Sequence, residues 1–79
     1  MTTTPETVRH RLAELLRLPA DRVPPHAELT DLITDSLAVV ETAIELQDEF
    51  DVILHHHDLR QVRTVADLTI LIATRADAA

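Results

Sequence analysis

Apolar residues recur at helical spacing in three separate segments of this sequence, and this spacing most constrains the fold. The three stripes are Val8, Leu12, Leu15 and Leu16; Val39, Ala43, Leu46 and Phe50, broadened by Val40 and Ile44; and Val65, Leu68, Leu71 and Ile72. Residues 52–54 form a short apolar run that could be a strand, but the sequence offers it no partner strand. We therefore expect an all-α fold in which residues 52–54 tether the chain to the core.

Capping signals set the helix boundaries. Thr4 and Pro5 suit the start of the first helix, and Pro19 is expected to end it. The second helix is predicted at residues 36–50, a short helical turn at 56–61, and a last helix from Thr64, whose spacing to Asp67 is that of a capping box. The tail from Arg75 to Ala79 is expected to fray. The prediction is a small four-helix bundle, with three main helices and one short helix, forming a single domain over residues 1–79.

A long loop connects the first two predicted helices, over residues 19–34. Pro24 and Pro25 restrict it, and the absence of glycine from the chain removes easy positive-φ turns. Loops of this length in small domains are usually functional or held by their own apolar residues. The expected anchors are Val23, Leu29, Leu32 and Ile33.

Composition narrows the possible classes of protein. With 79 residues, no cysteine and 46% hydrophobic residues, the chain must be stabilised by an aliphatic core rather than by disulfides or a thiolate zinc site. Phe50 is the single aromatic residue. No apolar run reaches a membrane-spanning length and no signal peptide is evident, so we expect a cytoplasmic monomer without membrane association.

Acidic residues outnumber basic ones, 14 to 7, for a formal net charge of −7. Residues 23–59 contain no Lys or Arg. The acidic residues in that segment are Glu28, Asp31, Asp35, Glu41, Glu45, Asp48, Glu49, Asp51 and Asp58. Such a surface repels nucleic acid and favours partners with basic docking patches.

Ser36 is the candidate functional residue, because it follows Asp35 at a predicted loop-to-helix junction. The plain alternative is that Asp35 and Ser36 only cap the helix. A catalytic serine would need a base, an orienting acid and an oxyanion hole, and the glycine-flanked elbow of serine hydrolases is missing. A helix N-terminus does favour a bound phosphate. We therefore expect no catalytic residue in this chain, and a serine that receives a phosphate-bearing group from another enzyme.

The sequence around Ser36 resembles that of the acyl carrier protein family. The resemblance rests on Asp35-Ser36-Leu37, Val40-Glu41 and Glu49-Phe50-Asp51, within a short acidic helical chain. It implies that Ser36 carries a covalent 4′-phosphopantetheine arm, which a phosphopantetheinyl transferase installs from coenzyme A with a divalent metal. The arm would hold an acyl or aminoacyl group as a thioester.

The resemblance also implies partners and the residues that meet them. The positions matching partner-facing residues of the family are Asp35, Leu37, Val40, Glu41, Ile44 and Asp48. Core packing remains an alternative role for Val40 and Ile44. The implied partners are an acyl-loading enzyme, either an acyltransferase or an adenylating ligase, and a ketosynthase or other processing enzymes with basic patches.

Three departures from the family pattern bear on the pathway. Ile33-Thr34 replace the usual glycine before Asp35, which suggests a stiffer or differently shaped turn. Ala38 stands where fatty-acid carriers commonly have an acid, and residues 55–60 are rich in histidine instead of acidic. These differences favour a discrete carrier of polyketide or hybrid natural-product biosynthesis. A peptidyl carrier of a nonribosomal pathway and an unmodified acidic adaptor are the alternatives.

Three consecutive histidines, His55, His56 and His57, raise the possibility of a metal site. Adjacent side chains on a helix point about 100° apart, so they do not converge on one ion. We therefore predict a solvated short helix and no metal.

Overall fold

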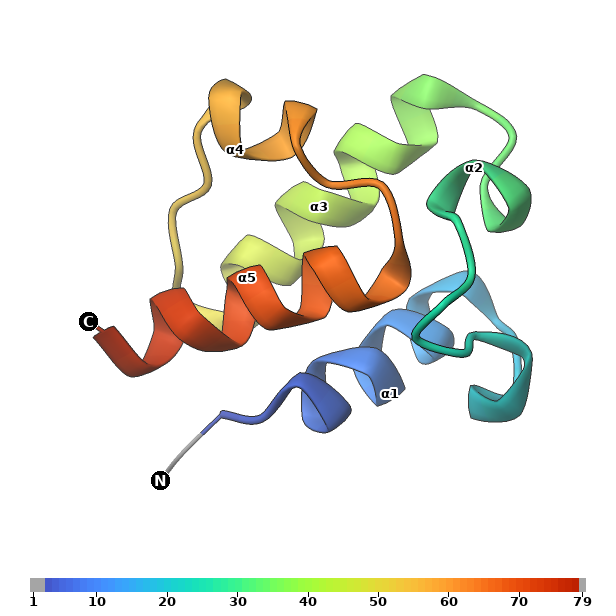
Figure 1. Ribbon diagram of the computed structural model, residues 1–79, viewed down its shortest axis with the longest axis horizontal. Coiled ribbons are helices and arrows are strands. Elements are labelled where there is room, and N and C mark those ends of the chain that lie inside the picture. Colours follow the sequence, from blue (N-terminus) through green and yellow to red (C-terminus); the bar gives the residue numbers. More distant parts are fainter. Residues whose placement is uncertain (1–2, 79) are drawn as a thin grey trace.

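The computed structural model describes residues 3–78, and all regular secondary structure in that range is helical (Figure 1). The elements in chain order are α1 (Pro5–Leu16), the 3₁₀ helix η1 (Ala20–Arg22), α2 (Leu29–Leu32), α3 (Ser36–Phe50), α4 (His56–Arg60) and α5 (Val65–Ala78). The predicted all-α bundle of three long helices and one short helix is confirmed. Two short elements, η1 and α2, lie inside the segment that was predicted as a loop. None of the described helices is long and apolar enough to cross a membrane.

Both ends of α1 are closed by hydrogen bonds. The Thr4 side chain accepts a hydrogen bond from the Thr7 N–H at 3.1 Å, and Pro5 occupies the first helical position, as predicted. The helix ends at Leu16, before Pro19, because Arg17 turns into the left-handed conformation with φ 59°. The Leu18 N–H then donates to the Ala13 carbonyl at 3.0 Å, which completes the C-terminal cap.

Side-chain caps also start the other two long helices. The Asp35 carboxylate accepts a hydrogen bond from the Leu37 N–H at 3.0 Å, so α3 begins at Ser36. At α5 the Thr64 hydroxyl accepts from the Asp67 N–H, and the Asp67 carboxylate accepts from the Thr64 N–H, both at 3.1 Å. This pair is the predicted capping box. The two backbone N–H donors, of Thr64 and Arg63, lower the pKa of Asp67 below its ordinary value.

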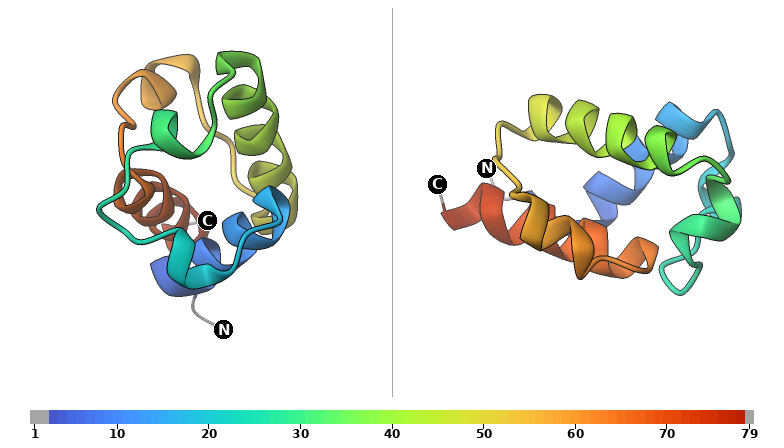
Figure 2. Two further views of the ribbon diagram at one scale, coloured as in Figure 1. Left: turned by 90° about the vertical axis from the view of Figure 1, so that its right-hand side faces the viewer. Right: turned by 90° about the horizontal axis from the view of Figure 1, so that it is seen from above.

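The core lies where the long helices α1, α3 and α5 meet (Figure 2). Its fully buried large side chains are Val8, Leu12, Val23, Leu46, Val65 and Ile72. On α3 the buried stripe is narrower than predicted, because Val40 and Ile44 are 44% and 49% exposed. The expectation that these two residues broaden the core stripe is therefore wrong.

The segment between α1 and α3 is held by both apolar anchors and backbone hydrogen bonds. Of the predicted anchors, Val23, Leu29 and Ile33 are buried and Leu32 is partly buried. Three backbone bonds tie this segment to the start of α5. The Leu29 N–H donates to the Arg63 carbonyl at 3.0 Å, the Val65 N–H to the Ala27 carbonyl at 2.9 Å, and the Ala66 N–H to the Pro25 carbonyl at 2.8 Å. These long-range bonds place α2 next to the start of α5.

A second tether connects α3 to α4. Val52 and Leu54 are buried and Ile53 is 73% exposed, so residues 52–54 contact the core without joining a sheet, as predicted. Arg75 of α5 donates to the Ile53 carbonyl at 3.2 Å and to the Asp58 carboxylate at 2.8 Å. Since α5 continues as a helix to Ala78, the expected fraying from Arg75 is wrong up to that residue, and Ala79 lies outside the described residues.

Candidate functional site

Ser36 is the first residue of α3 and is exposed to solvent. It follows a short connection from α2, which ends at Leu32 (Figure 1). Ile33 and Asp35 both have extended backbone, with φ −127° and −102°. Among the described residues only Arg17 and Asp51 have positive φ, so Thr34 does not need the freedom of a glycine. The turn before Ser36 therefore accepts a residue with a side chain at no backbone cost.

The start of α3 presents backbone N–H groups beside the Ser36 hydroxyl. Helix geometry leaves the first N–H groups without intrahelical acceptors. Asp35 uses its carboxylate for the Leu37 N–H and its carbonyl for the Val39 N–H, at 3.0 and 3.2 Å. Within residues 3–78 the N–H groups of Ser36 and Ala38 have no acceptor, so they are available to another group. Together with the helix dipole they favour an anion on the Ser36 oxygen, although the Asp35 charge opposes it in part.

The residues predicted to face partners form one stripe along α3. Leu37, Val40, Ile44 and Asp48 are spaced by three, four and four residues, which puts them on one side of a helix. Leu37 is 61% exposed, and Glu41 and Asp48 are exposed beside the apolar members. This stripe continues directly from Ser36, so a molecule that approaches the serine along α3 meets both apolar and acidic side chains.

Arginines from the two ends of the chain neutralise part of the predicted acidic surface. Three of its nine acidic residues form ion pairs, namely Glu28 with Arg63, Glu49 with Arg11, and Asp58 with Arg75. These pairs have N–O distances between 2.6 and 2.8 Å. No local pattern in the sequence indicates these ion pairs, because each joins residues at least 17 positions apart. Among the described residues of this surface, the acidic groups without an ion pair therefore lie on α3 and on the residues shortly before and directly after it.

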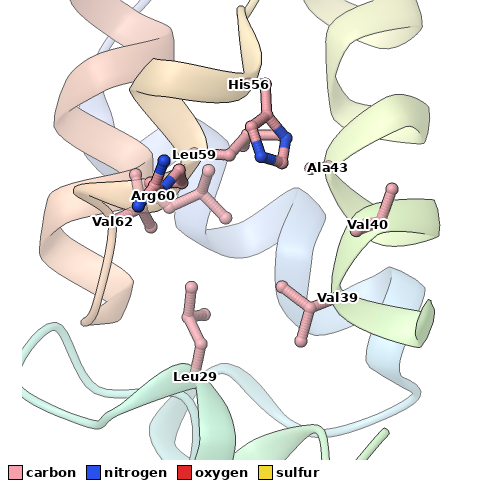
Figure 3. A pocket seen from close by; sticks show the side chains of 9 residues that line it. Leu29, Val39, Val40, Ala43, His56, Leu59, Arg60 and Val62 are labelled. Carbon is pink, nitrogen blue, oxygen red and sulfur yellow. The ribbon is translucent and has the colours of Figure 1, made fainter. Parts of the chain in front are cut away.

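A cavity of about 210 Å³ opens beside α3 and was not predicted from the sequence (Figure 3). Leu29 of α2, Val39 and Ala43 of α3, Leu59 of α4 and Leu68 of α5 contribute apolar side chains to it. The helical spacing of the sequence predicts only a core role for Val39. No local pattern in the sequence indicates the cavity, because its lining comes from α2, α3, α4 and α5.

The three histidines have different surroundings. The His55 N–H donates to the Asp58 carboxylate at 2.9 Å and so helps to start α4. His57 contacts the Gln61 amide at 3.0 Å, and His56 lines the cavity. Among the described residues no three His, Cys, Asp or Glu side chains are grouped as a metal site.

Known proteins are similar in sequence to this chain over the region that contains Ser36. The family described as "Phosphopantetheine attachment site" matches residues 6–72, a range that includes Ser36 and all of α3. The meromycolate extension acyl carrier protein of Mycolicibacterium smegmatis is 32% identical over 77 residues, covering 91% of this chain and 78% of the relative. An acyl carrier protein of Syntrophus aciditrophicus is 31% identical over 67 residues, covering 84% of each chain.

Part of a much larger protein is also similar. A non-reducing polyketide synthase of Penicillium brasilianum is 36% identical over 62 residues, which is 78% of this chain. The chain spans 2% of the length of that synthase. The similarity therefore concerns one small region of the synthase.

Proposed function

The chain belongs to the phosphopantetheine-binding acyl carrier protein family, and on that premise we propose that Ser36 carries the arm and that the protein presents an acyl group to partner enzymes. The family and its prosthetic group, 4′-phosphopantetheine, were predicted from the sequence and are confirmed by the match over residues 6–72. When bound, the arm supplies a terminal thiol that holds an acyl group as a thioester.

The observation that carries the assignment is the position of Ser36. It is the only serine in the sequence, it is exposed, and it begins a helix of 15 residues. Its surroundings fit a phosphodiester, because the Ser36 and Ala38 N–H groups can donate to phosphate oxygens. No side chain needs to move to expose the hydroxyl to a transferase.

We propose that α3 also directs the partners. Leu37, Val40 and Ile44 offer apolar contact area, while Glu41 and Asp48 can pair with Arg or Lys of a partner. Charge complementarity of this kind increases the rate of encounter and makes it sensitive to salt. The proposed partners are a phosphopantetheinyl transferase, an acyl-loading enzyme, and a ketosynthase or other processing enzyme. In this proposal the chain itself catalyses no reaction.

For the pathway we propose polyketide or hybrid natural-product biosynthesis. The similarity to a region of a polyketide synthase supports it, and so does Ala38 in place of an acidic residue.

Intact-mass measurement tests the carrier function. The protein is incubated with coenzyme A, Mg²⁺ and a phosphopantetheinyl transferase of broad specificity. We expect a gain of one phosphopantetheine group in the unaltered protein and in the control Thr34→Ala, and no gain in Ser36→Ala. If several transferases that modify another carrier leave this protein unmodified, the unmodified adaptor becomes the better hypothesis.

A further inference from the structure

A groove of about 340 Å³ lies between α1 and α3 and shares no lining residue with the apolar cavity. Three carboxylates of α3 line it, together with one leucine and one cation of α1, and these residues are Glu45, Asp48, Glu49, Leu15 and Arg11. Asp48 also belongs to the exposed stripe that continues from Ser36. The groove therefore adjoins the surface that we propose for partners.

Arg11 is the cation of this groove, and its guanidinium reaches across to α3. One terminal nitrogen donates to Glu49 of α3 at 2.8 Å, and the other donates to Glu14 of its own helix at 3.1 Å. The hydrogen bond to Glu49 is the largest cause of the raised pKa of Arg11. The Nε atom of Arg11 is buried, so the guanidinium lies against the protein instead of extending into solvent.

The plain alternative is that this ion pair only ties α1 to α3. Ion pairs near the surface contribute little to stability, however. Leu12 of α1 and Leu46 of α3 are fully buried in the shared core, so the two helices have apolar contacts that do not involve the pair. The larger consequence of the pair is electrostatic, because it neutralises Glu49 at one edge of the acidic surface.

Without Arg11, the groove would attract cationic side chains of a partner. A Lys or Arg side chain can lay its apolar stem on Leu15 and its charge between Glu45 and Glu49, which lie four residues apart on one side of α3. A partner held there would be displaced toward α1, away from the stripe that leads to Ser36. Charges at an interface fix the orientation in which two proteins meet.

We propose that Arg11 occupies this groove as an internal cation, and that it thereby keeps the cationic side chains of partners on the exposed stripe of α3. The proposal rests on the proposed carrier function for the presence of basic partners. It goes beyond that function by assigning an orientation-determining role to a residue outside α3.

Titration with a hexaarginine peptide, blocked at both ends, tests this role without modification of Ser36. At low ionic strength, where surface charges are least screened, the methyl NMR signals of Leu15 and Ile44 report on the groove and on the stripe, respectively. In the unaltered protein we expect the Ile44 signal to shift and the Leu15 signal to stay nearly unchanged. In Arg11→Met, which keeps an apolar stem but no charge, both signals should shift.

The freed Glu49 should also tighten binding of the peptide. We expect its dissociation constant to fall about two- to fivefold in Arg11→Met, which is the effect of one additional surface ion pair. Adding Glu49→Gln to Arg11→Met should return the dissociation constant to about the value of the unaltered protein.

The matched control is Arg63→Met. It also removes one positive charge, but it frees Glu28, which does not line the groove. Arg63→Met should therefore tighten binding less than Arg11→Met does, and it should leave the Leu15 signal unchanged during the titration.

Three outcomes would overturn the proposal: a Leu15 signal that shifts as much as that of Ile44 in the unaltered protein, binding to Arg11→Met that is no tighter than to Arg63→Met, or no binding of the peptide at all. The first outcome needs no variant, so it can be observed even if Arg11→Met does not fold. Failure of the carrier function is a separate result, because it is measured by the mass gain at Ser36.

Discussion

Arg17 and Asp51 occupy the two left-handed backbone positions among the described residues, with φ 59° and 54°. Each one follows a long helix and turns the chain so that the last carbonyls are capped. Glycine is the usual residue there, because a β-carbon makes this conformation unfavourable. Aspartate tolerates the conformation better than arginine does. The absence of glycine therefore lowers the free energy of unfolding more at Arg17 than at Asp51.

Replacing Arg17 with glycine should stabilise the protein. Relief of the left-handed strain outweighs the greater flexibility of glycine in the unfolded chain, so we expect Arg17→Gly to raise the free energy of unfolding by about 0.5–1 kcal/mol. Asp51→Gly should give a smaller gain. Urea unfolding followed by circular dichroism measures both changes, and a loss of stability in Arg17→Gly would contradict the strain argument.

At the scale of elements, α4 is held by a network around Asp58. The Asp58 carboxylate accepts hydrogen bonds from Arg75 of α5 and from the His55 N–H, at 2.8 and 2.9 Å. The Arg75 guanidinium, and then the His55 N–H, lower the pKa of Asp58 below its ordinary value of 3.8. A helix of five residues is too short to be stable by itself. This network therefore fixes α4, and with it one wall of the cavity.

The network should make stability depend on pH in the acidic range. Because the pKa of Asp58 is lower in the folded state, its contribution is present above the unfolded value of 3.8 and is lost as the pH falls through the folded pKa. We expect Asp58→Asn to unfold at lower urea concentration than the unaltered protein at neutral pH. The difference should shrink as the pH falls below 3.8.

The matched control for this prediction is Asp48→Asn. Asp48 is exposed on α3 and has no ion pair within residues 3–78, so the substitution should leave the urea midpoint nearly unchanged at neutral pH. If the effect of Asp58→Asn stayed constant down to about pH 2.5, the Asp58–Arg75 interaction would not be its source.

At the scale of the whole molecule, the two sides of α3 differ in burial. Its buried side, with Ala43 and Leu46, contributes to the core shared by the long helices. Its exposed side carries Val40 and Ile44, which the core does not use. The apolar residues of one helix are thus divided between the core and the exposed surface that we propose for partners.

Two substitutions on α3 should show that its buried side, and not its exposed side, stabilises the fold. Leu46 is fully buried, so Leu46→Ala should lower the free energy of unfolding by about 2–5 kcal/mol. Ile44 is 49% exposed, so Ile44→Ala should change it by no more than about 0.5 kcal/mol. Thermal or urea unfolding of the two variants measures the difference. A large loss in Ile44→Ala would mean that Ile44 belongs to the core.

The sequence by itself determined the features that depend on neighbouring residues. The bounds of α3, the capping box at Thr64 and Asp67, and the place of Ser36 at a helix start all follow from local caps and helical spacing. These are interactions between residues at most four apart, so their pattern is visible in the order of the residues. The family was predictable for the same reason, because its motif is a short local segment.

Only the tertiary structure decided the features that depend on distant residues. The α2 helix is held next to α5 by the bond from the Leu29 N–H to the Arg63 carbonyl. Val40 and Ile44 are exposed because α1 and α5 pack against the other side of α3. The cavity beneath Arg60 exists because α2, α3, α4 and α5 meet without filling the space between them. Burial and cavities depend on how helices pack against each other, and the spacing of residues within one helix does not specify that packing.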